Sequence, residues 1–309
     1  MSVKILVISS NLIGDTILST GVIRFFNKQN PEAKFTFVIG PSAEPIFKNF
    51  KSVEKIITVS KKKFNMHWLE IIYNCYGKKW DVIIDFRSSL LSYLLSHNKK
   101  FIFKKKTNIN HIQQLSDYFG FDCSELFIVN NNEEEQIVKK NISDNFNYFV
   151  IFPGGNWKPK IWSVENYNSL LKKILSKNKN IKFILVGSSV EEKIYYSKIT
   201  KNIDSKYILN LFGSSLTQTA AYMKKSKIFI GNDSGLSHIA SASNLKSIVL
   251  FGPTNEKIYG PFQKDSQVVR TNESYDYFKS INIDQTKSYM GSISVEKIYS
   301  ILKKNNYCE

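Results

Sequence analysis

The chain has 309 residues, more than one hydrophobic core usually contains, so we expect two domains. Its formal net charge of +17 predicts attraction to anionic partners, but no helix-turn-helix, RNP-like or zinc-finger pattern accompanies the charge, and nucleic acid is not expected. No apolar run is long enough to span a membrane, and the start "MSVKILVISS" resembles a strand rather than a signal peptide, which predicts a cytoplasmic protein.

Elements of the first half alternate between apolar runs and helical patterns. Strands are expected at 3–9, 34–40, 55–59, 81–86 and 101–103, and helices at 14–30 and 110–121. This alternation predicts a parallel α/β sheet. The polar run 130–145 then separates two halves, which places the domain boundary near Asn145 and gives domains 1–145 and 146–309.

The second half repeats the pattern. Strands are expected at 148–153, 181–187, 227–231 and 247–251, with helices at 164–177 and 215–225. Two consecutive doubly wound units therefore follow each other, and such sheets bind ligands at the carboxyl ends of their strands. We expect the two domains to face a cleft, and the last helix, 294–304, to pack back on the first domain.

The segment "GNDSG", 231–235, follows a strand and precedes a helix, where free backbone N–H groups favour an anion. Gly235 permits close approach, while Ser234 and His238 offer donors to a phosphate. Asp233 is expected to point at sugar hydroxyls or at backbone donors instead. The alternative is an ordinary helix cap with a hydrogen-bonded histidine, since caps use the same residue types.

Three segments together resemble one family: "ILVISSNLIGDTILSTGVIRFFNKQNPEAKFTFVI", "FPGGNWKPKIWSVENYNSLL" and "GNDSGLSHIASASNLKSIVLFGPTNEKIYGPF". They are similar to the heptosyltransferases of glycosyltransferase family nine, which build the inner core of lipopolysaccharide. Many relatives carry a cysteine where this chain has Tyr289. The resemblance implies a GT-B fold with an N-terminal acceptor domain, a C-terminal domain holding ADP-heptose or a similar nucleotide sugar, and inversion at the anomeric carbon.

The resemblance also implies site residues. The catalytic aspartate of the family falls on Asp15, for which the alternative role is a cap for a helix beginning at Thr16; Asp85 is the second candidate for the base. Donor-binding roles fall on Lys160, Asn156 and Glu191, with Lys158 and Glu192 as rivals, and on Asp233, Ser234, Gly235 and His238. Trp162 is expected to pack, and the loop Phe212–Leu216 to meet the base of the nucleotide.

Cofactors and partners complete the expectation. No Asp-x-Asp pair is present to hold a divalent ion, so no metal is expected. The lysine clusters Lys61–Lys63 and Lys99–Lys106 are either a solvated surface or a patch for the phosphorylated glycolipid acceptor and the anionic inner membrane, which would make the protein peripheral on the cytoplasmic face. A nucleotide-sugar epimerase and a non-catalytic binding protein stay as alternatives. A dinucleotide oxidoreductase is disfavoured because no G-x-G-x-x-G follows the first strand.

Overall fold

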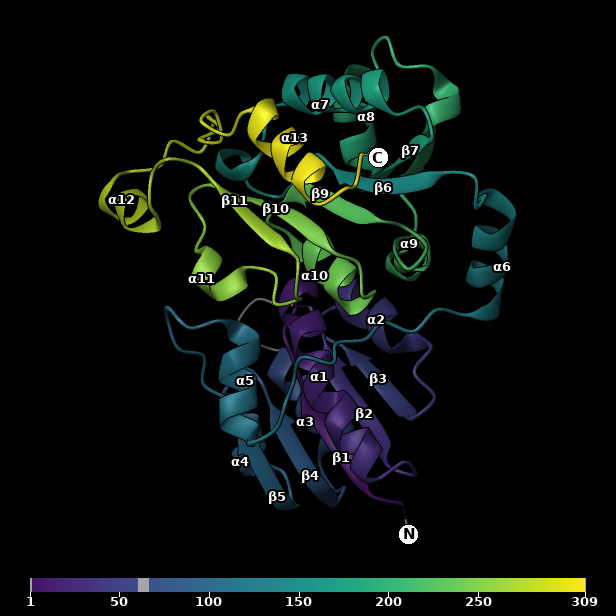
Figure 1. The fold of residues 1–309 in the computed structure, drawn as a ribbon. Helices are drawn as coiled ribbons and strands as arrows, with labels where there is room; N and C mark the ends of the chain where they lie inside the picture. Colours follow the sequence, from purple (N-terminus) through teal and green to yellow (C-terminus); the bar gives the residue numbers. More distant parts are fainter. Residues whose placement is uncertain (1, 61–66, 309) are drawn as a thin grey trace. The chain divides into compact units, whose positions relative to one another are not determined.

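The computed structural model describes residues 2–60 and 67–308. The chain divides into two compact units, Met1–Val129 and Asn130–Glu309, each built around its own parallel sheet (Figure 1). The lysine cluster Lys61–Lys63 lies outside the described residues. Both units show the alternation of strands and helices that the sequence predicts, and the expected doubly wound α/β class is confirmed.

The first unit contains a five-stranded sheet in the order β3-β2-β1-β4-β5. Its elements are β1 (Lys4–Ile8), α1 (Ile13–Gln29), β2 (Lys34–Ile39), α2 (Glu44–Lys48), β3 (Val53–Thr58), α3 (His67–Cys75), β4 (Trp80–Asp85), α4 (Leu91–Leu94), β5 (His97–Ile102) and α5 (His111–Phe119), with a 3₁₀ turn at Pro41–Ala43. The order reverses direction beside β1, so β1 and β4 lie at the topological switch point of this sheet.

The two faces of the first sheet bury different side chains, because successive residues of a strand point to opposite sides. Leu6 and Ile8 of β1 join a buried cluster with residues of α3 and α4. The opposite face is covered by α1 and α5, which contact each other (Figure 1). Phenylalanine rings dominate that side; Phe25 stacks on Phe121, and Phe37 on Phe47. The unit is therefore a three-layer sandwich with its own core.

The second unit contains a six-stranded sheet in the order β11-β10-β9-β6-β7-β8. Its strands are β6 (Asn147–Phe152), β7 (Ile181–Gly187), β8 (Ile208–Phe212), β9 (Ile228–Asn232), β10 (Ser247–Phe251) and β11 (Gln267–Arg270). Its α-helices are α6 (Asn132–Asn141), α7 (Val164–Lys177), α8 (Ser189–Ile199), α9 (Leu216–Met223), α10 (Gly235–Ala242), α11 (Glu256–Tyr259), α12 (Tyr275–Ser280) and α13 (Val295–Lys304), with 3₁₀ turns at Lys158–Lys160 and Ser205–Tyr207.

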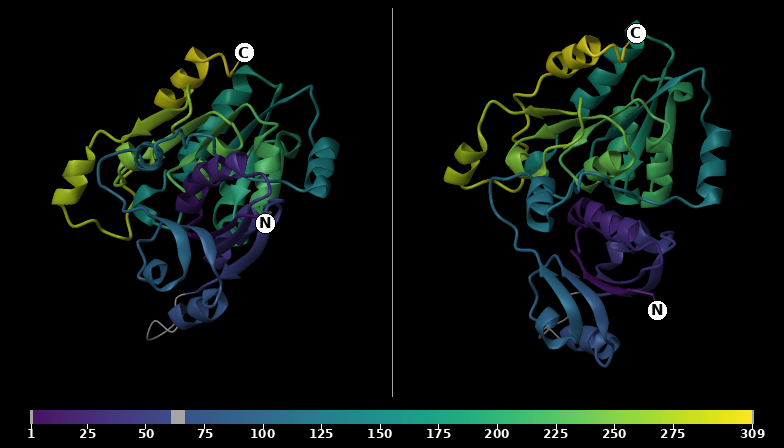
Figure 2. Two further views of the ribbon diagram at one scale, coloured as in Figure 1. Left: turned by 90° about the horizontal axis from the view of Figure 1, so that it is seen from below. Right: turned by 60° about the horizontal axis from the view of Figure 1, so that its bottom comes forward.

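Helices cover both faces of the second sheet (Figures 1 and 2). On one face α7 packs between α8 and α13, and on the other α9 packs between α6 and α10. Because β6 and β9 are neighbours although they are far apart in sequence, the order reverses between them. The loops that follow these two strands are consequently brought together at the switch point, where open α/β sheets bind ligands.

Two expectations about the ends of the second unit differ from the structure. The polar run expected to separate the domains folds as α6, and the division falls between Val129 and Asn130 rather than near Asn145. Asn131 and Glu134 form a capping box that starts α6, and Glu134 also accepts a hydrogen bond from Thr217 of α9. These bonds attach a helix with few apolar residues to the second unit.

The last helix belongs to the second unit, which corrects the expectation that it packs on the first domain. Ile298 and Leu302 of α13 are buried in the same core cluster as the apolar side of α7. On the rim of this contact Lys173 of α7 forms an ion pair with Glu296 at 2.8 Å. Apolar burial therefore fixes α13 on its own unit, with the ion pair adding little because it is exposed.

Candidate functional site

The switch point of the second sheet brings together two of the predicted donor segments. The loop 153–160 leaves β6, and the segment 232–235 leaves the adjacent strand β9. Both follow carboxyl ends of strands, as the sequence pattern predicts for a ligand site. Side-chain contacts between these two loops hold the candidate site together.

Asn232 is the buried side chain that joins the two loops. Its Nδ2 donates to the carbonyl oxygens of Pro153 at 3.1 Å and Gly154 at 2.8 Å, and its Oδ1 accepts from the backbone N–H of Trp162 at 3.1 Å. The hydroxyl of Tyr167 lies 3.2 Å from the same Oδ1. Burial raises the pKa of Tyr167 well above its ordinary value, so this hydroxyl stays protonated as a donor. The sequence pattern places Asn232 within the motif 231–235 but indicates no role for it.

Replacement of this amide is expected to loosen the whole loop. We predict that Asn232→Ala lowers the free energy of unfolding by about 3 kcal/mol, because several buried polar groups lose their partner at once. Urea denaturation measures the change. Asn156→Ala is the matched control, since Asn156 is exposed in the same loop. A loss at Asn232 no greater than at Asn156 would contradict the bracing role.

Lys160 and Asp233 face each other across the two loops. The Lys160 Nζ lies 3.8 Å from Asp233 Oδ2, and the two side chains are only 12% and 8% exposed. Lys158 and Asn156 are exposed. An ammonium group carries three donors, so Lys160 keeps capacity for a phosphate oxygen while it holds Asp233. The Asp233 carboxylate thus pairs with a lysine, a pairing that the sequence pattern did not indicate, and its contact with sugar hydroxyls or backbone donors stays a prediction.

The helix α10 begins directly after Asp233. Ser234 is its N-cap residue, but its Oγ makes no cap hydrogen bond, is buried, and has no partner among the described residues. The alternative role as a helix cap therefore does not describe this serine. Gly235 is the first residue of α10, and His238, which is buried, follows one turn later with its ring 6.3 Å from that of Tyr259. A buried hydroxyl at a helix N-terminus suits an anionic ligand.

Glu191 ties the loop after β6 to the start of α8. Its carboxylate accepts hydrogen bonds from the backbone N–H of Gly155 at 2.8 Å and from the N–H and Oγ of Ser188. A Cβ on Gly154 would stand 1.9 Å from Glu191 Oε1, which explains the glycine in this loop. These three bonds leave the carboxylate little capacity for ribose hydroxyls. The rival Glu192 accepts from Asn210 at 2.6 Å.

Other residues of the second unit have structural roles. Trp162 is fully buried and donates from Nε1 to the Ile293 carbonyl at 2.8 Å, which confirms the prediction that it packs. Ser215, in the loop Phe212–Leu216, caps α9. Arg270 holds the loop after β10 by donating to the carbonyls of Gly252 and Thr254, a role that its sequence position did not indicate. Tyr289, at the position of the family cysteine, donates from its backbone N–H to Pro159.

The first unit carries the predicted base in the first turn of α1, the helix that follows β1. Asp15 is the third residue of α1, and Leu12 is the N-cap, so the helix begins earlier than Thr16 and Asp15 is not its cap. The Asp15 carboxylate lies 3.2 Å from Lys105 Nζ and 3.4 Å from Ser10 Oγ, and its side chain is 22% exposed. In the sequence, Lys105 stands out only as a member of the lysine cluster Lys99–Lys106. An accessible carboxylate beside a hydroxyl and an ammonium is suited to accept a proton from a bound hydroxyl.

The second candidate for the base, Asp85, has a structural role in the first unit. Asp85, at the end of β4, is fully buried. Its carboxylate accepts from the backbone N–H of Arg87 at 2.8 Å and from the N–H and Oγ of Ser89 at 2.8 and 2.7 Å. A carboxylate with these bonds and no exposed surface shapes the turn after β4 and is not placed to reach a substrate. The geometry therefore favours Asp15.

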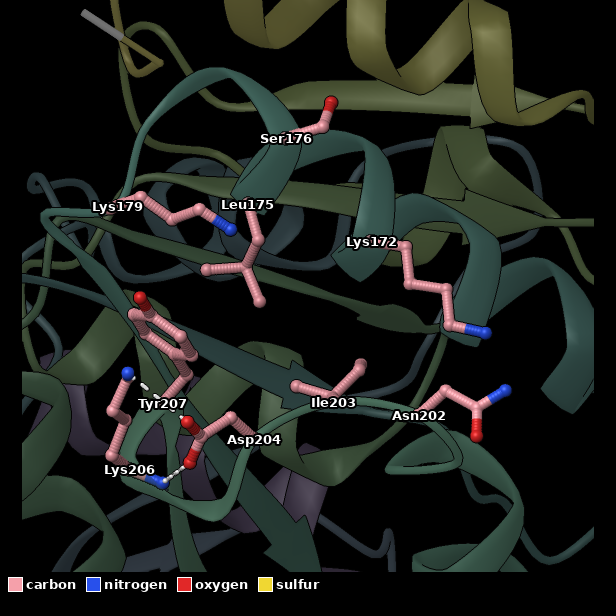
Figure 3. Close-up of a pocket in the computed structure, with 9 residues that line it drawn as sticks. All are labelled: Lys172, Leu175, Ser176, Lys179, Asn202, Ile203, Asp204, Lys206 and Tyr207. Carbon is pink, nitrogen blue, oxygen red and sulfur yellow. Dashed lines mark hydrogen bonds and ion pairs between the residues drawn. The ribbon is translucent and has the colours of Figure 1, made fainter.

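The cavity drawn in Figure 3 lies elsewhere on the second unit. It has a volume of about 490 Å³ and is lined by Lys172, Leu175, Ser176, Lys179, Asn202, Ile203, Asp204, Lys206 and Tyr207. Residues 179 and 202–207 precede β7 and β8, so the cavity lies at the amino ends of these strands. Lys206 is paired with Asp204 at 3.1 Å and lies over the Tyr207 ring. This wall contains none of the predicted site residues.

Within residues 2–60 and 67–308, no three His, Cys, Asp or Glu side chains gather where they would hold a metal ion. In the same part of the chain, each helix is too short or too polar to traverse a bilayer.

Proteins similar to this chain include lipopolysaccharide heptosyltransferases and a family 9 glycosyltransferase. The lipopolysaccharide heptosyltransferase 1 of Campylobacter coli is 23% identical, over 97% of this chain and 98% of that protein. The crystal structure of a family 9 glycosyltransferase from Veillonella parvula has a TM-score of 0.75 at 22% identity, covering 97% of this chain and 96% of that one. Escherichia coli heptosyltransferase WaaC, solved with ADP, has a TM-score of 0.72 at 16% identity, covering 98% and 99%.

These likenesses extend along both units, and the fold is the GT-B fold of those enzymes. The decisive match is to a family: residues 87–287 match glycosyltransferase family 9 (heptosyltransferase). This range includes the loops after β6, β9 and β10 that build the candidate site. The chain belongs to glycosyltransferase family 9 and is a glycosyltransferase.

Proposed function

We propose that this enzyme transfers a heptose from ADP-heptose to an inner-core sugar of lipopolysaccharide, with inversion at the anomeric carbon. The observation that supports this most directly is the second unit's switch point, where Lys160, Asp233 and the Ser234 hydroxyl, which has no partner within residues 2–60 and 67–308, meet the N-terminus of α10. That arrangement fits a sugar diphosphate. The relative solved with ADP supports the choice of nucleotide.

Departure of ADP requires the stabilisation of negative charge on the diphosphate. In the proposed complex Lys160 donates to a phosphate oxygen, and the Ser234 hydroxyl and the first N–H groups of α10 donate to others. Asp233 holds the Lys160 ammonium in place through their ion pair. Asn232 keeps both loops at a fixed spacing. These groups are in place before the reaction, so little reorganisation is needed when the charge develops.

Attack on the sugar requires a base. We infer that Asp15 takes the proton of the acceptor hydroxyl as its oxygen forms a bond to the anomeric carbon, while the bond from that carbon to the diphosphate oxygen breaks and ADP leaves. Lys105, at 3.2 Å from Asp15, and its neighbours Lys104 and Lys106 are proposed to bind phosphate on the acceptor glycolipid. The lysine cluster thus acquires a role beside the base.

Transfer is favoured over the two alternatives. Membership of a glycosyltransferase family supports transfer to an acceptor rather than epimerisation of the donor. The accessible carboxylate of Asp15 favours catalysis over a protein that only binds a nucleotide sugar. The test is an incubation of the purified chain with ADP-heptose, with and without a phosphorylated, deacylated inner-core acceptor, followed by mass spectrometry. Heptosylated acceptor and ADP are expected; an epimerised donor formed without acceptor would overturn the proposal.

Turnover is expected to be independent of divalent metal, because Lys160 and the start of α10 supply the donors for the diphosphate. We predict that excess EDTA leaves the rate of ADP release unchanged. A coupled assay of ADP with and without EDTA measures this. Loss of activity that magnesium restores would show that a metal ion shares the diphosphate site.

The place of action follows from the acceptor. A lipid-linked acceptor is presented at a membrane surface, so we propose a cytoplasmic enzyme that associates peripherally with the cytoplasmic face of the inner membrane. The positive charge of the chain supports attraction to anionic lipid.

A further inference from the structure

Six exposed apolar side chains gather on the outer side of α3 and α4 in the first unit. On α3 and just after it they follow the helical spacing i, i+4, i+7, and around the single turn of α4 they follow the spacing i, i+3, i+4. Tyr73 is 88% exposed and Leu90 is 81% exposed. The complete set, here called the α3/α4 face, is Leu69, Tyr73, Tyr76, Leu90, Tyr93 and Leu94.

Both helices cover the same face of the sheet. Ile71 and Cys75 on the inner side of α3 share one buried cluster with Leu91 and Leu95 at α4, together with strand residues such as Trp80. Since the inner sides pack on one sheet face, the outer sides point away from it together. Their apolar residues therefore form one patch rather than scattered exposed side chains, and such patches mark interaction surfaces.

Basic residues surround this patch. Lys100 of β5 lies with its Nζ 3.8 Å from the Tyr93 ring centroid, and Arg87 lies over the Trp68 ring of α3 at 5.9 Å. Lys78 and Lys79 are exposed directly after α3. Between residues 67 and 100, the basic residues Lys78, Lys79, Arg87 and Lys100 accompany three acidic residues, of which Asp85 is buried. Leucine and tyrosine rimmed by lysine are typical of surfaces at a lipid headgroup layer.

We propose that the α3/α4 face is the surface with which this protein docks on an anionic lipid bilayer, with the apolar side chains entering the headgroup layer and the basic rim meeting lipid phosphates. This names the contact of the peripheral enzyme proposed above and rests on that proposal. A second copy of the chain is a poorer occupant, because a two-fold contact would bring the two basic rims against each other.

The test compares two triple variants of exposed residues. Leu69→Ser with Tyr73→Ser and Leu94→Ser removes apolar surface from the α3/α4 face. The matched control, Val190→Ser with Ile194→Ser and Phe262→Ser, removes exposed apolar surface from the second unit. Binding is measured by co-sedimentation with vesicles of phosphatidylcholine alone and of phosphatidylcholine mixed with phosphatidylglycerol, without any substrate.

We expect the unaltered protein and the control to bind the anionic vesicles, and the first variant to lose about tenfold or more in partitioning. Lys100→Gln should weaken binding less and reduce its dependence on salt. Equal binding of the two triple variants to anionic vesicles would overturn the proposal. It would also be overturned if no form of the protein bound vesicles and light scattering showed a dimer that only the α3/α4 variant abolished.

Heptose transfer is measured separately from vesicle binding. Transfer to a deacylated, water-soluble acceptor should be unchanged in both triple variants, since none of their residues belongs to the proposed site. Vesicle binding by a protein that transfers no heptose would leave the docking face standing and reject the proposed function. If the protein transferred heptose but did not bind vesicles, the docking proposal would be rejected and the proposed function would stand.

Discussion

Asp15→Asn is expected to reduce turnover by roughly a hundredfold or more while leaving affinity for ADP almost unchanged. The asparagine keeps the size and the hydrogen-bonding reach of the aspartate but does not accept the proton of the acceptor hydroxyl. The donor groups lie in the second unit and keep their own contacts, so ADP binding should persist. Initial rates measure the first effect, and isothermal titration calorimetry measures the second.

Two measurements decide whether the loss is chemical. The melting temperature of Asp15→Asn should stay close to that of the unaltered protein, because the Asp15 side chain is partly exposed and does not cap α1. Asp85→Asn serves as the contrasting variant: it weakens three hydrogen bonds to a buried carboxylate and should lower stability. Near-normal turnover of a folded Asp15→Asn protein would remove this residue from the role of base.

Lys160→Met is expected to lower kcat/KM for the donor by about a hundredfold, because one preorganised contact to the departing diphosphate is lost. Methionine keeps the length and much of the volume of the lysine. Calorimetry with ADP should also show weaker binding, since the ammonium contacts the diphosphate before and after the reaction. Steady-state kinetics at varied donor concentration provide the measurement.

Lys158→Met is the matched control, because Lys158 is an exposed lysine in the same 3₁₀ turn. Lys158→Met should leave kcat/KM for the donor nearly unchanged. If both substitutions lowered kcat/KM equally, Lys160 would have no specific role in binding the diphosphate. Lys160→Met also leaves Asp233 with a buried charge and no ion-pair partner. The double variant with Asp233→Asn separates the causes, since it should recover stability but not donor turnover.

Local patterns predicted the α/β architecture because buried strands and amphipathic helices differ in period. Apolar runs indicated β1, β2, β6, β7, β9 and β10 nearly at their observed bounds. The runs of β8 and β11 were missed, since both are short and contain polar residues. The helix α6 was missed for a related reason: its stability comes from a capping box and from bonds to α9, and neither is visible as apolar periodicity.

Part of the candidate site was predictable from local sequence, and part depends on contacts between distant segments. Sequence by itself determined which segments follow strands and begin helices, and so pointed to residues 231–235, because those signals lie within a few residues of one another. Asp15 was indicated as the base by the resemblance to the family, since its spacing alone fits a helix cap. Only the tertiary structure decided that Lys160 faces Asp233, that Lys105 faces Asp15, that Asp85 is buried and that Asn232 braces two loops. Strand order creates these contacts, and it is set by packing between segments that lie dozens of residues apart in the chain.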